Sequence, residues 1–424
     1  MMQPSLPAAR RRPVFGASLA AVLALSACSG VTGNARVDTV EASGDGVLRV
    51  GLILDNAGDS SFLNTSQLAA AQLAVREINA AGGHKGRPVE LLPVQAGGDT
   101  AAQAHALVSD KADVVIGPTD SSHATEAIDV LSRARTPLIS PANTAAGLSS
   151  AESGGYYFRT TAADVAQGPV LAKLAKDGGA KTIAILHQEG AYGKEVAAAV
   201  ADAAAGAGLQ VLDNAGFAGG EAGDAARKAG AAKPDAVVVV AREGSQGALA
   251  ELNNAGVSGA SLLLSDGAFA RYGSKLGTKA LDGARAVVSG QLPSAAFQAR
   301  LLGVDEGLKD VSYAAETFDA VTLAALAAAR AQDDAGPSIA ANLLAVSGGT
   351  ATESQATAAA ACTTYKDCLP GLASGGGINY DGESGPIAFD TNGDITSATF
   401  TVFTYGSDNI PTATGHETAG RRGS

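Results

Sequence analysis

Short apolar, β-branched runs alternate with segments of helical periodicity along most of the chain. In the clearest example, residues 113–117 read DVVIG, and a helix-patterned segment separates them from a second run, Leu138–Ser140. Continuous apolar runs of this length suit strands that are buried on both faces of a parallel sheet. Regular alternation of strands and helices predicts parallel sheets with helices on both faces, so we expect an α/β fold.

The alternation falls into two runs of similar size, which meet near residues 150–163. With 424 residues, the chain is too long for one ordinary domain, so we predict two doubly wound parallel-sheet lobes. After the second run, residues 313–345 have a helical pattern. Residues 387–405 then predict two strands around an Asn392-Gly393 turn.

Two loops, 117–122 and 140–148, follow neighbouring strands of the first predicted sheet. Both leave the carboxyl ends of their strands, which is the edge where open α/β sheets bind ligands. Hydroxyl side chains are frequent in both loops, namely Thr119, Ser121, Ser122, Ser140 and Thr144. The first loop also opens a helix, where unpaired backbone amides suit an anion. The pattern fits a pocket for a small carboxylate ligand, and it also fits ordinary helix capping.

The first residues have the pattern of an export signal. Arg10, Arg11 and Arg12 form a basic region, and the apolar run 14–25 that follows is too short to span a bilayer. The run ends in Leu-Ser-Ala-Cys, with the cysteine at Cys28, which resembles a bacterial lipobox. We predict cleavage before Cys28 and lipidation of that residue. The alternative is a plain secretory signal with an accidental cysteine.

The polar, Gly-rich residues 28–46 then predict a flexible tether. No later segment is long and apolar enough to cross a membrane, so we expect a protein held by lipid at the outer face of the cytoplasmic membrane.

Only two cysteines remain after Cys28, namely Cys362 and Cys368. In an exported chain, two cysteines at short spacing predict one local disulfide. Zinc is disfavoured, because no histidine lies near enough in the sequence to complete a tetrahedral site. The formal net charge of −12 argues against nucleic acid as a partner.

The motifs of common enzyme classes are missing from the sequence. There is no G-x-S-x-G elbow, no phosphate loop of the G-x-x-x-x-G-K type and no H-E-x-x-H pair. We therefore predict no catalytic residues, no cofactor, no metal and no enzymatic activity.

Several stretches, taken in order, resemble one known family: residues 74–92, 114–124, 136–149, 156–168, 183–195, 264–269 and 380–394. Their order and spacing are similar to the leucine/isoleucine/valine-binding (extracellular amino-acid receptor) family of ABC-transporter substrate-binding proteins. The resemblance covers roughly residues 47–405. It implies the type I periplasmic-binding-protein fold, in which three crossover strands join the lobes, here near 160–165, 289–292 and 378–388.

The resemblance therefore implies a division of the chain. We expect a signal peptide at 1–27, a flexible tether at 28–46, lobe 1 at 47–162, lobe 2 at 163–289, the second part of lobe 1 at 290–378 with the two cysteines, the C-terminal strands of lobe 2 at 379–410 and a disordered tail at 411–424.

The resemblance also implies a ligand site. In that family a serine at the position of Ser121 binds the carboxylate of the ligand, and we include the neighbouring Ser122. The ammonium group meets the backbone carbonyl at Ala142, the threonine at Thr144 and an acidic residue at Asp266. A tyrosine from the second lobe, matching Tyr192, closes over the ligand.

Two positions depart from the family pattern. Asp266 stands where the branched-chain binders carry a longer glutamate, and Arg242 stands where an aromatic residue is common. Arg242 would pair with an acidic substrate, or it would be a solvated surface charge. An amino-acid ligand is therefore expected, without assurance of an aliphatic side chain.

We predict a substrate-binding lipoprotein that captures an amino acid or similar small zwitterion between its lobes. Its partners would be the permease and ATPase subunits of an ABC importer. Two alternatives stay open: an extracytoplasmic sensor of the same fold that is not coupled to uptake, and a binder of an amide, urea or aromatic acid.

Overall fold

Two large sheets, one parallel and one mixed, organise the computed structural model, which describes residues 1–2, 36–37, 40–94, 97–218, 220–349 and 359–420. The predicted signal peptide and Cys28 lie outside the described residues, apart from Met1 and Met2. Residues 32–424 belong to one compact unit. No helix among the described residues is both long and apolar enough to cross a bilayer.

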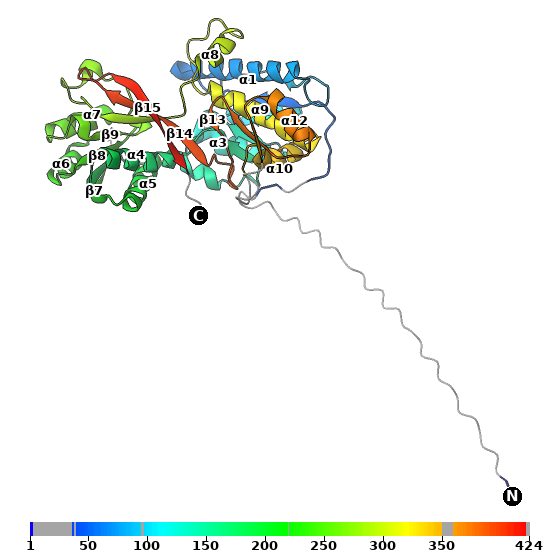
Figure 1. The fold of residues 1–424 in the computed structure, drawn as a ribbon, viewed down its shortest axis with the longest axis horizontal. Coiled ribbons are helices and arrows are strands. Elements are labelled where there is room, and N and C mark those ends of the chain that lie inside the picture. The colour runs from blue at the N-terminus through cyan, green and yellow to red at the C-terminus, as the bar shows by residue number, and fades with distance from the viewer. Residues whose placement is uncertain (3–35, 38–39, 95–96, 219, 350–358, 421–424) are drawn as a thin grey trace. The chain divides into compact units, whose positions relative to one another are not determined.

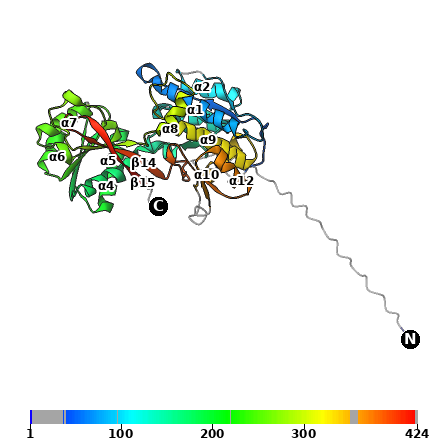
Figure 2. The ribbon, with the colours of Figure 1, turned by 45° about the horizontal axis from the view of Figure 1, so that its top comes forward.

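The first sheet has five parallel strands in the order β2-β1-β3-β4-β5. These strands are β1 (Arg49–Leu52), β2 (Glu90–Leu91), β3 (Val114–Ile116), β4 (Leu138–Ser140) and β5 (Tyr157–Arg159). The helices connected to them are α1 (Phe62–Ala80), α2 (Thr100–Ser109) and α3 (Ser121–Arg133), and α9 (Ala314–Ala331) and α10 (Gly336–Val346) follow later in the chain. In Figures 1 and 2, α9 lies beside α1.

Helices cover both faces of this sheet, because successive side chains of a strand point to opposite faces. One face packs with α1 and α9 through Val50, Leu52, Val114, Ile116, Ile139 and Phe158. The other face packs with α2 and α3 through Val115, Leu138 and Tyr157. We call the body built on this sheet the first lobe.

The second sheet has seven strands in the order β15-β14-β10-β9-β8-β6-β7. Five of them are parallel, namely β6 (Thr182–Gln188), β7 (Gln210–Phe217), β8 (Ala236–Val240), β9 (Leu262–Leu264) and β10 (Arg285–Ser289). The strands β14 (Ser397–Tyr405) and β15 (Pro411–Gly420) complete the sheet in antiparallel pairings. We call the body built on this sheet the second lobe.

Four helices pack on the second sheet in two pairs: α4 (Gln167–Asp177) with α5 (Ala191–Ala207), and α6 (Gly223–Ala231) with α7 (Ser245–Asn254). The first pair shares a core with Ile183, Ile185, Val238 and Val240, and the second pair shares a core with Ala184, Leu186, Val237 and Val239. The alternation along β6 and β8 therefore places helices on both faces, as in a doubly wound sheet. The predicted α/β fold is confirmed.

A small third sheet extends the first lobe. It contains β11 (Ala360–Cys362), β12 (Ile378–Gly382) and β13 (Gly385–Pro386), with the helix α12 (Tyr365–Ala373) between the first two strands. The predicted Cys362–Cys368 disulfide is present and joins β11 to α12. A further helix, α8 (Ala295–Leu302), packs on α1.

The predicted boundary at 378/379 is misplaced. Ile378, Tyr380, Ile387 and Phe389 all lie in the core of the first lobe. The third crossover therefore falls at about residues 390–396, just before β14, rather than at 378–388. The sequence pattern is ambiguous here, because β12 and β14 are both short apolar strands and only packing distinguishes their sheets.

The prediction of two strands around Asn392-Gly393 is also wrong in detail. The turn forms, with Gly393 N donating to Asp390 O at 3.0 Å, but only a single bridge between Phe389 and Ile395 flanks it. The long strand β14 starts beyond the turn and pairs with β10 and β15 instead.

The predicted disordered tail contains a strand. Residues 411–420 form β15, which pairs with β14 along its whole length, and residues 421–424 lie outside the described part. The segment is polar because β15 is an edge strand, and most of its side chains are exposed. A polar edge strand has little of the apolar signal by which buried strands are recognised.

The predicted flexible tether is partly docked on the first lobe. The carboxylates of Asp333 and Asp334 accept four hydrogen bonds, of 2.8–3.2 Å, from the backbone amides of residues 43–46. Further upstream, Arg36 Nη1 donates to Tyr157 O at 3.0 Å and Nη2 to Asn392 O at 3.3 Å, and its guanidinium lies 4.5 Å from the Phe158 ring centroid. Residues 36 and 43–46 thus belong to the folded body.

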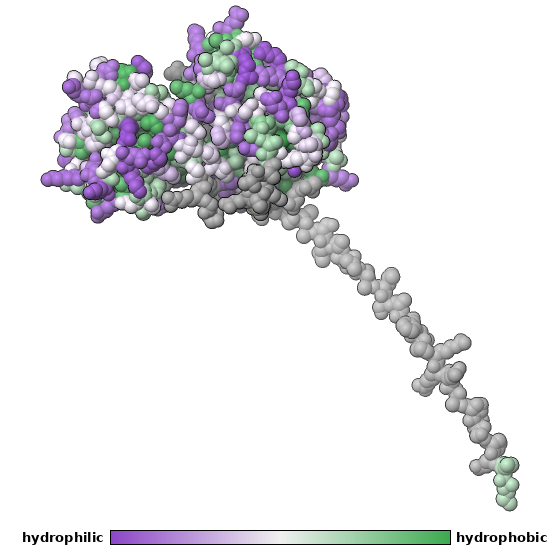
Figure 3. Space-filling model, viewed as in Figure 1, coloured by the Kyte–Doolittle hydropathy of each residue, from purple (hydrophilic) through white to green (hydrophobic). Residues whose placement is uncertain are grey.

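Hydrophilic residues cover most of the face shown in Figure 3, and hydrophobic residues form small separate patches. Among the described residues beyond Met1 and Met2, the large apolar side chains that are exposed are Val40, Phe62, Leu212, Leu292 and Leu302. Scattered apolar side chains of this kind are normal on a protein surface.

Candidate ligand site at the strand ends

The two loops singled out in the first sheet are joined by a serine. Ser121 is the first residue of α3, and its Oγ accepts hydrogen bonds from Thr144 N at 3.1 Å and Ala145 N at 3.3 Å. Ala142 is buried on the same loop as Thr144, with its amide bonded to Ser140 Oγ at 3.2 Å. The structure therefore brings Ser121, Ala142 and Thr144 together at the carboxyl edge of the sheet.

The amides at the start of α3, in contrast, are already bonded. The buried carboxylate of Asp55 accepts from Thr119 N at 2.8 Å and Asp120 N at 3.2 Å. Asp120 Oδ1 accepts from Ser122 N at 2.8 Å and from Ser122 Oγ at 2.7 Å. The prediction that these amides are unpaired is wrong for Thr119, Asp120 and Ser122, whose N–H groups are bonded to two carboxylates of the chain itself. Ser122 lies exposed and caps the helix together with Asp120.

In the second lobe, Tyr192 and Asp266 are direct neighbours. Tyr192 lies in the first turn of α5, and its hydroxyl donates to Asp266 Oδ1 at 2.6 Å, lies 2.9 Å from Ser265 Oγ and accepts from Gly267 N at 3.1 Å. Asp266 follows β9, and its amide donates to Gln167 Oε1 at 2.9 Å. Burial, and next the Asp266 carboxylate, raise the pKa of the Tyr192 hydroxyl well above its usual value.

Arg242, which follows β8, connects these two groups. Its guanidinium lies 4.0 Å from the ring centroid of Tyr192, and its Nη2 lies 3.1 Å from each oxygen of Asp164 and 3.4 Å from Thr144 Oγ1. Thr144 follows β4 of the first lobe, so this contact links the two lobes. Arg242 is half-exposed, as a surface charge would be, but it is paired with Asp164 rather than isolated.

Asp164 is the partner of Arg242 that sequence reasoning missed. Its side chain is 3% exposed, against 50% for Arg242. Burial, and next the nearby Asp266, raise the pKa of Asp164 to about 7, although the Arg242 guanidinium opposes the shift. The carboxyl follows the first crossover and lies 78 residues from Arg242 in the sequence, so no local pattern indicates the pair.

Tyr313 is a second residue that the sequence did not indicate. It precedes α9 in a left-handed conformation with φ of 58°. Its hydroxyl is within electrostatic range of Asp164, Arg242 and Asp266, and burial raises its pKa to about 12. No sequence signal marks Tyr313, since it lies in a segment that simply has a helical pattern.

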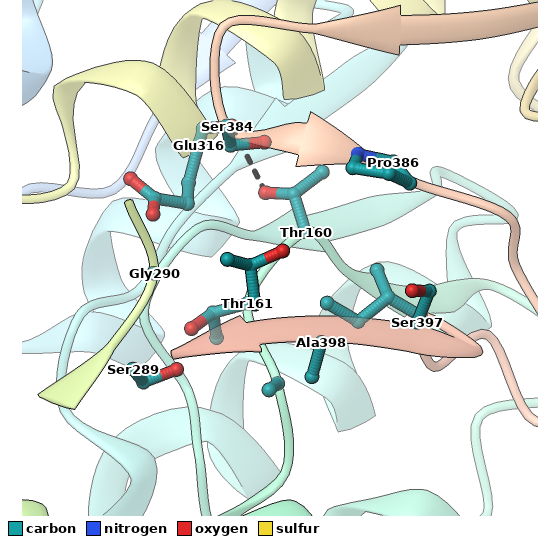
Figure 4. A pocket seen from close by; sticks show the side chains of 12 residues that line it. Thr160, Thr161, Ser289, Gly290, Glu316, Ser384, Pro386, Ser397 and Ala398 are labelled. Atoms are coloured by element: carbon teal, nitrogen blue, oxygen red, sulfur yellow. Dashed lines mark hydrogen bonds between the residues drawn. The ribbon is translucent and has the colours of Figure 1, made fainter. Parts of the chain in front are cut away.

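A separate small pocket lies at the crossovers (Figure 4). All three crossovers contribute to its lining, which comprises Thr160, Thr161, Ala162, Ser289, Gly290, Glu316, Ser384, Pro386, Ile395, Ser397, Ala398 and Thr399. Thr160 Oγ1 donates to Glu316 O at 2.9 Å, and burial raises the pKa of the Glu316 carboxyl to about 7. None of the predicted ligand residues lines this cavity.

The described residues contain no group of three or more His, Cys, Asp or Glu side chains placed to hold a metal ion. The candidate site offers hydroxyls and charged groups of both signs, from Ser121, Thr144, Tyr192, Arg242 and Asp266. Such a set suits a small molecule that itself carries both charges.

Known proteins resemble the chain in sequence over part of its length. A leucine-, isoleucine-, valine-, threonine- and alanine-binding protein of Pseudomonas aeruginosa is 36% identical over 168 residues, which are 37% of this chain and 42% of that protein. The chain thus spans about two fifths of the length of this relative.

Solved structures resemble the chain over most of its length. A branched-chain amino acid transporter substrate-binding protein of Streptococcus pneumoniae, in complex with isoleucine, has a TM-score of 0.59 at 20% identity and covers 88% of this chain and 99% of its own. A solute-binding protein of an ABC transporter from Rhodopseudomonas palustris, in complex with p-hydroxybenzoic acid, has a TM-score of 0.60 at 15% identity and covers 88% and 98%. At these identities the likeness concerns the fold.

A family model described as "Periplasmic binding protein" matches residues 47–363. The family consists of binding proteins rather than enzymes and implies an extracytoplasmic location. The resemblance to leucine/isoleucine/valine-binding proteins and to the type I fold is confirmed. The fold has two lobes with polar side chains at the strand ends, and the family matches three quarters of the sequence. The chain therefore belongs to the periplasmic binding protein family.

Proposed function

We propose that this protein captures an amino acid, or a similar small zwitterion, between the strand ends of its two lobes. One observation carries the proposal: Arg242 links a first-lobe group, Ser121 and Thr144, to a second-lobe group, Tyr192 and Asp266. Ser121 would bind the carboxylate of the ligand, and the carbonyl of Ala142 and the hydroxyl of Thr144 would accept from its ammonium. Asp266 would pair with the ammonium.

The printed functions of the relatives support an amino acid as ligand. The Pseudomonas relative is named for binding five amino acids, and the Streptococcus protein was solved with isoleucine. Titration calorimetry of residues 29–424 against the common amino acids tests the proposal. We expect binding of at least one, and a loss of affinity of at least tenfold in the variant that combines Ser121→Ala with Thr144→Val, since each hydrogen bond is worth about 1 kcal/mol.

An unchanged affinity in that double variant would show that the ligand binds elsewhere.

A second candidate ligand class is aromatic acids, because the Rhodopseudomonas protein was solved with p-hydroxybenzoic acid. Heat from 4-hydroxybenzoate, with none from any amino acid, would favour that class and keep the fold assignment.

We further propose that the protein is the substrate-binding lipoprotein of an ABC importer, lipidated at Cys28 and paired with a permease and an ATPase. Deletion of the gene should then abolish uptake of the ligand. If ligand binds to the purified protein but uptake is normal in the deletion strain, a sensor is the better description. Replacement Cys28→Ser should release the protein from the membrane fraction if the lipid is its anchor.

A further inference from the structure

Arg242 is the cation of the candidate site, and the groups around it are acidic. Asp164 and Asp266 lie beside it in the second lobe, and its charge also reaches Asp120 at the start of α3. The other arginine near the site, Arg159, is fully buried and has each of its nitrogens bonded within the protein. Of these two arginines, only Arg242 therefore has donors left for a ligand carboxylate.

The guanidinium of Arg242 uses only one of its three nitrogens. Nη2 makes all of the hydrogen bonds of the guanidinium, to both oxygens of Asp164 and to Thr144 Oγ1. Nη1 and Nε have no hydrogen-bond partner within the described part of the chain. The side chain is 50% exposed, so these donors are open to an incoming molecule. A guanidinium with free donors on one edge is suited to bind a carboxylate through two parallel hydrogen bonds.

The side chain is also held in place before any ligand arrives. The Tyr192 ring lies against the guanidinium at 4.0 Å, and Arg242 N donates to Gln188 Oε1 at 2.8 Å. Asp164 fixes the Nη2 end. A preorganised donor loses little conformational entropy when it binds, which increases the gain from each hydrogen bond.

An aliphatic side chain on the ligand would be a poor neighbour for the Arg242 guanidinium. It would cover the open edge of the guanidinium and remove water from it without supplying an acceptor, and an unpaired charged donor is costly to bury. A second carboxylate on the ligand would supply that acceptor. We infer that Arg242 binds a second carboxylate of the ligand, which makes the ligand an acidic amino acid rather than a branched-chain one.

This inference rests on the proposed function and specifies its ligand class. The test is titration calorimetry of residues 29–424 with L-glutamate, L-aspartate and L-leucine, for the wild type and for Arg242→Met. We expect an acidic amino acid to bind more tightly than leucine, and the variant to lose at least 30-fold in affinity for it, because it loses hydrogen bonds between two charged groups. Leucine should lose clearly less affinity than the acidic amino acid does.

Two further variants serve as controls for this test. Arg271→Met removes an exposed arginine outside the site and should leave every affinity unchanged. In the combined variant Asp164→Asn with Arg242→Met, the aspartate is neutralised as well, so a loss of affinity there cannot arise from an orphaned buried carboxylate. The loss should persist in this variant.

The possible outcomes separate the inference from the proposed function. Tighter binding of leucine than of both acidic amino acids by the wild type, or an acidic amino acid bound equally well by Arg242→Met, would overturn the inference and leave the proposed function in place. Failure of every amino acid to bind would overturn both.

Discussion

Two arginines at the lobe boundary illustrate two uses of the same side chain. Arg159, at the end of β5, is fully buried, and its three nitrogens bond to Asp394, the carbonyls of Asn143 and Ala145, and Ser149 Oγ at 2.7–3.1 Å. Arg242 is half-exposed and engages acceptors through Nη2 alone. Every nitrogen of the Arg159 guanidinium is thus bonded to described residues, whereas two nitrogens of Arg242 are not.

The difference indicates what each arginine does. A buried guanidinium with all donors bonded fixes the segments that surround it, here the first and the third crossover. A guanidinium that is held at one end and open at the other is arranged for a partner from outside the chain. The comparison predicts that changes near Arg159 affect stability, whereas changes near Arg242 affect ligand binding.

The largest effect is expected for Arg159→Met. The variant leaves the buried Asp394 carboxylate without its partner, which should lower the free energy of unfolding by roughly 3–5 kcal/mol. Urea unfolding monitored by circular dichroism measures this loss. Adding Asp394→Asn should recover part of it, because the orphaned charge is then removed. A loss below about 1 kcal/mol would end the distinction between the two arginines.

The second prediction concerns pH. Burial raises the pKa of Asp164 to about 7, so the folded state holds this proton more tightly than the unfolded state does. The stability that Asp164 contributes is therefore fully present below pH ~4 and is lost as the pH rises toward 7.

We expect the unfolding free energy of the wild type, relative to Asp164→Asn, to fall by roughly 3 kcal/mol between pH 4 and 7. Urea titrations at several pH values measure the difference. Asp113 and Glu316 also have raised pKa values but occur in both proteins, so their contributions cancel. A difference that grows with pH would contradict the assignment.

A smaller effect is expected when the hydroxyl bonded to each arginine is removed. Ser149 accepts from Arg159 and Thr144 from Arg242. Ser149→Ala should cost about 1–2 kcal/mol of stability and leave ligand affinity unchanged, because a buried donor loses its acceptor. Thr144→Val should leave stability within about 0.5 kcal/mol and reduce affinity about tenfold. Equal effects of both variants on stability and affinity would refute the comparison.

The smallest effect is expected for a third arginine, Arg36, which contacts β5 and the turn at residue 392 from the N-terminal segment. Arg36→Ala should lower stability by about 1 kcal/mol, through two hydrogen bonds and a cation–π contact. Arg36→Lys should retain part of this contribution, since it keeps the charge but not the fork. Thermal melting of both variants is sufficient to measure the effect, and no change in either would mean that the segment is not docked in solution.

Much of the fold could be predicted from the sequence, because buried parallel strands such as Val114–Ile116 and Ala236–Val240 are apolar on both faces. The polar edge strand β15 carries no such signal, and the sheet to which β12 belongs depends on packing alone. Local pattern therefore identified elements better than it identified their partners.

The same limit applies to the candidate site. The alternation of strands and helices predicts the two loops that carry Ser121 and Thr144, whereas Tyr192 and Asp266 were expected from the family resemblance. The occupation of the α3 amides by Asp55 could not be foreseen, because that carboxylate comes from a loop 64 residues away. Interactions between distant loops depend on side-chain geometry that periodicity does not contain.

The docking of residues 43–46 by Asp333 and Asp334, and of Arg36 by the β5 segment, has a consequence for distance from the membrane. If Cys28 carries a lipid, only residues 28–35 separate that lipid from the first docked side chain. Eight residues reach at most about 28 Å when fully extended. The near end of the body would then lie within about three or four Debye lengths of the lipid headgroups at physiological salt, and this short segment would limit its height above the bilayer.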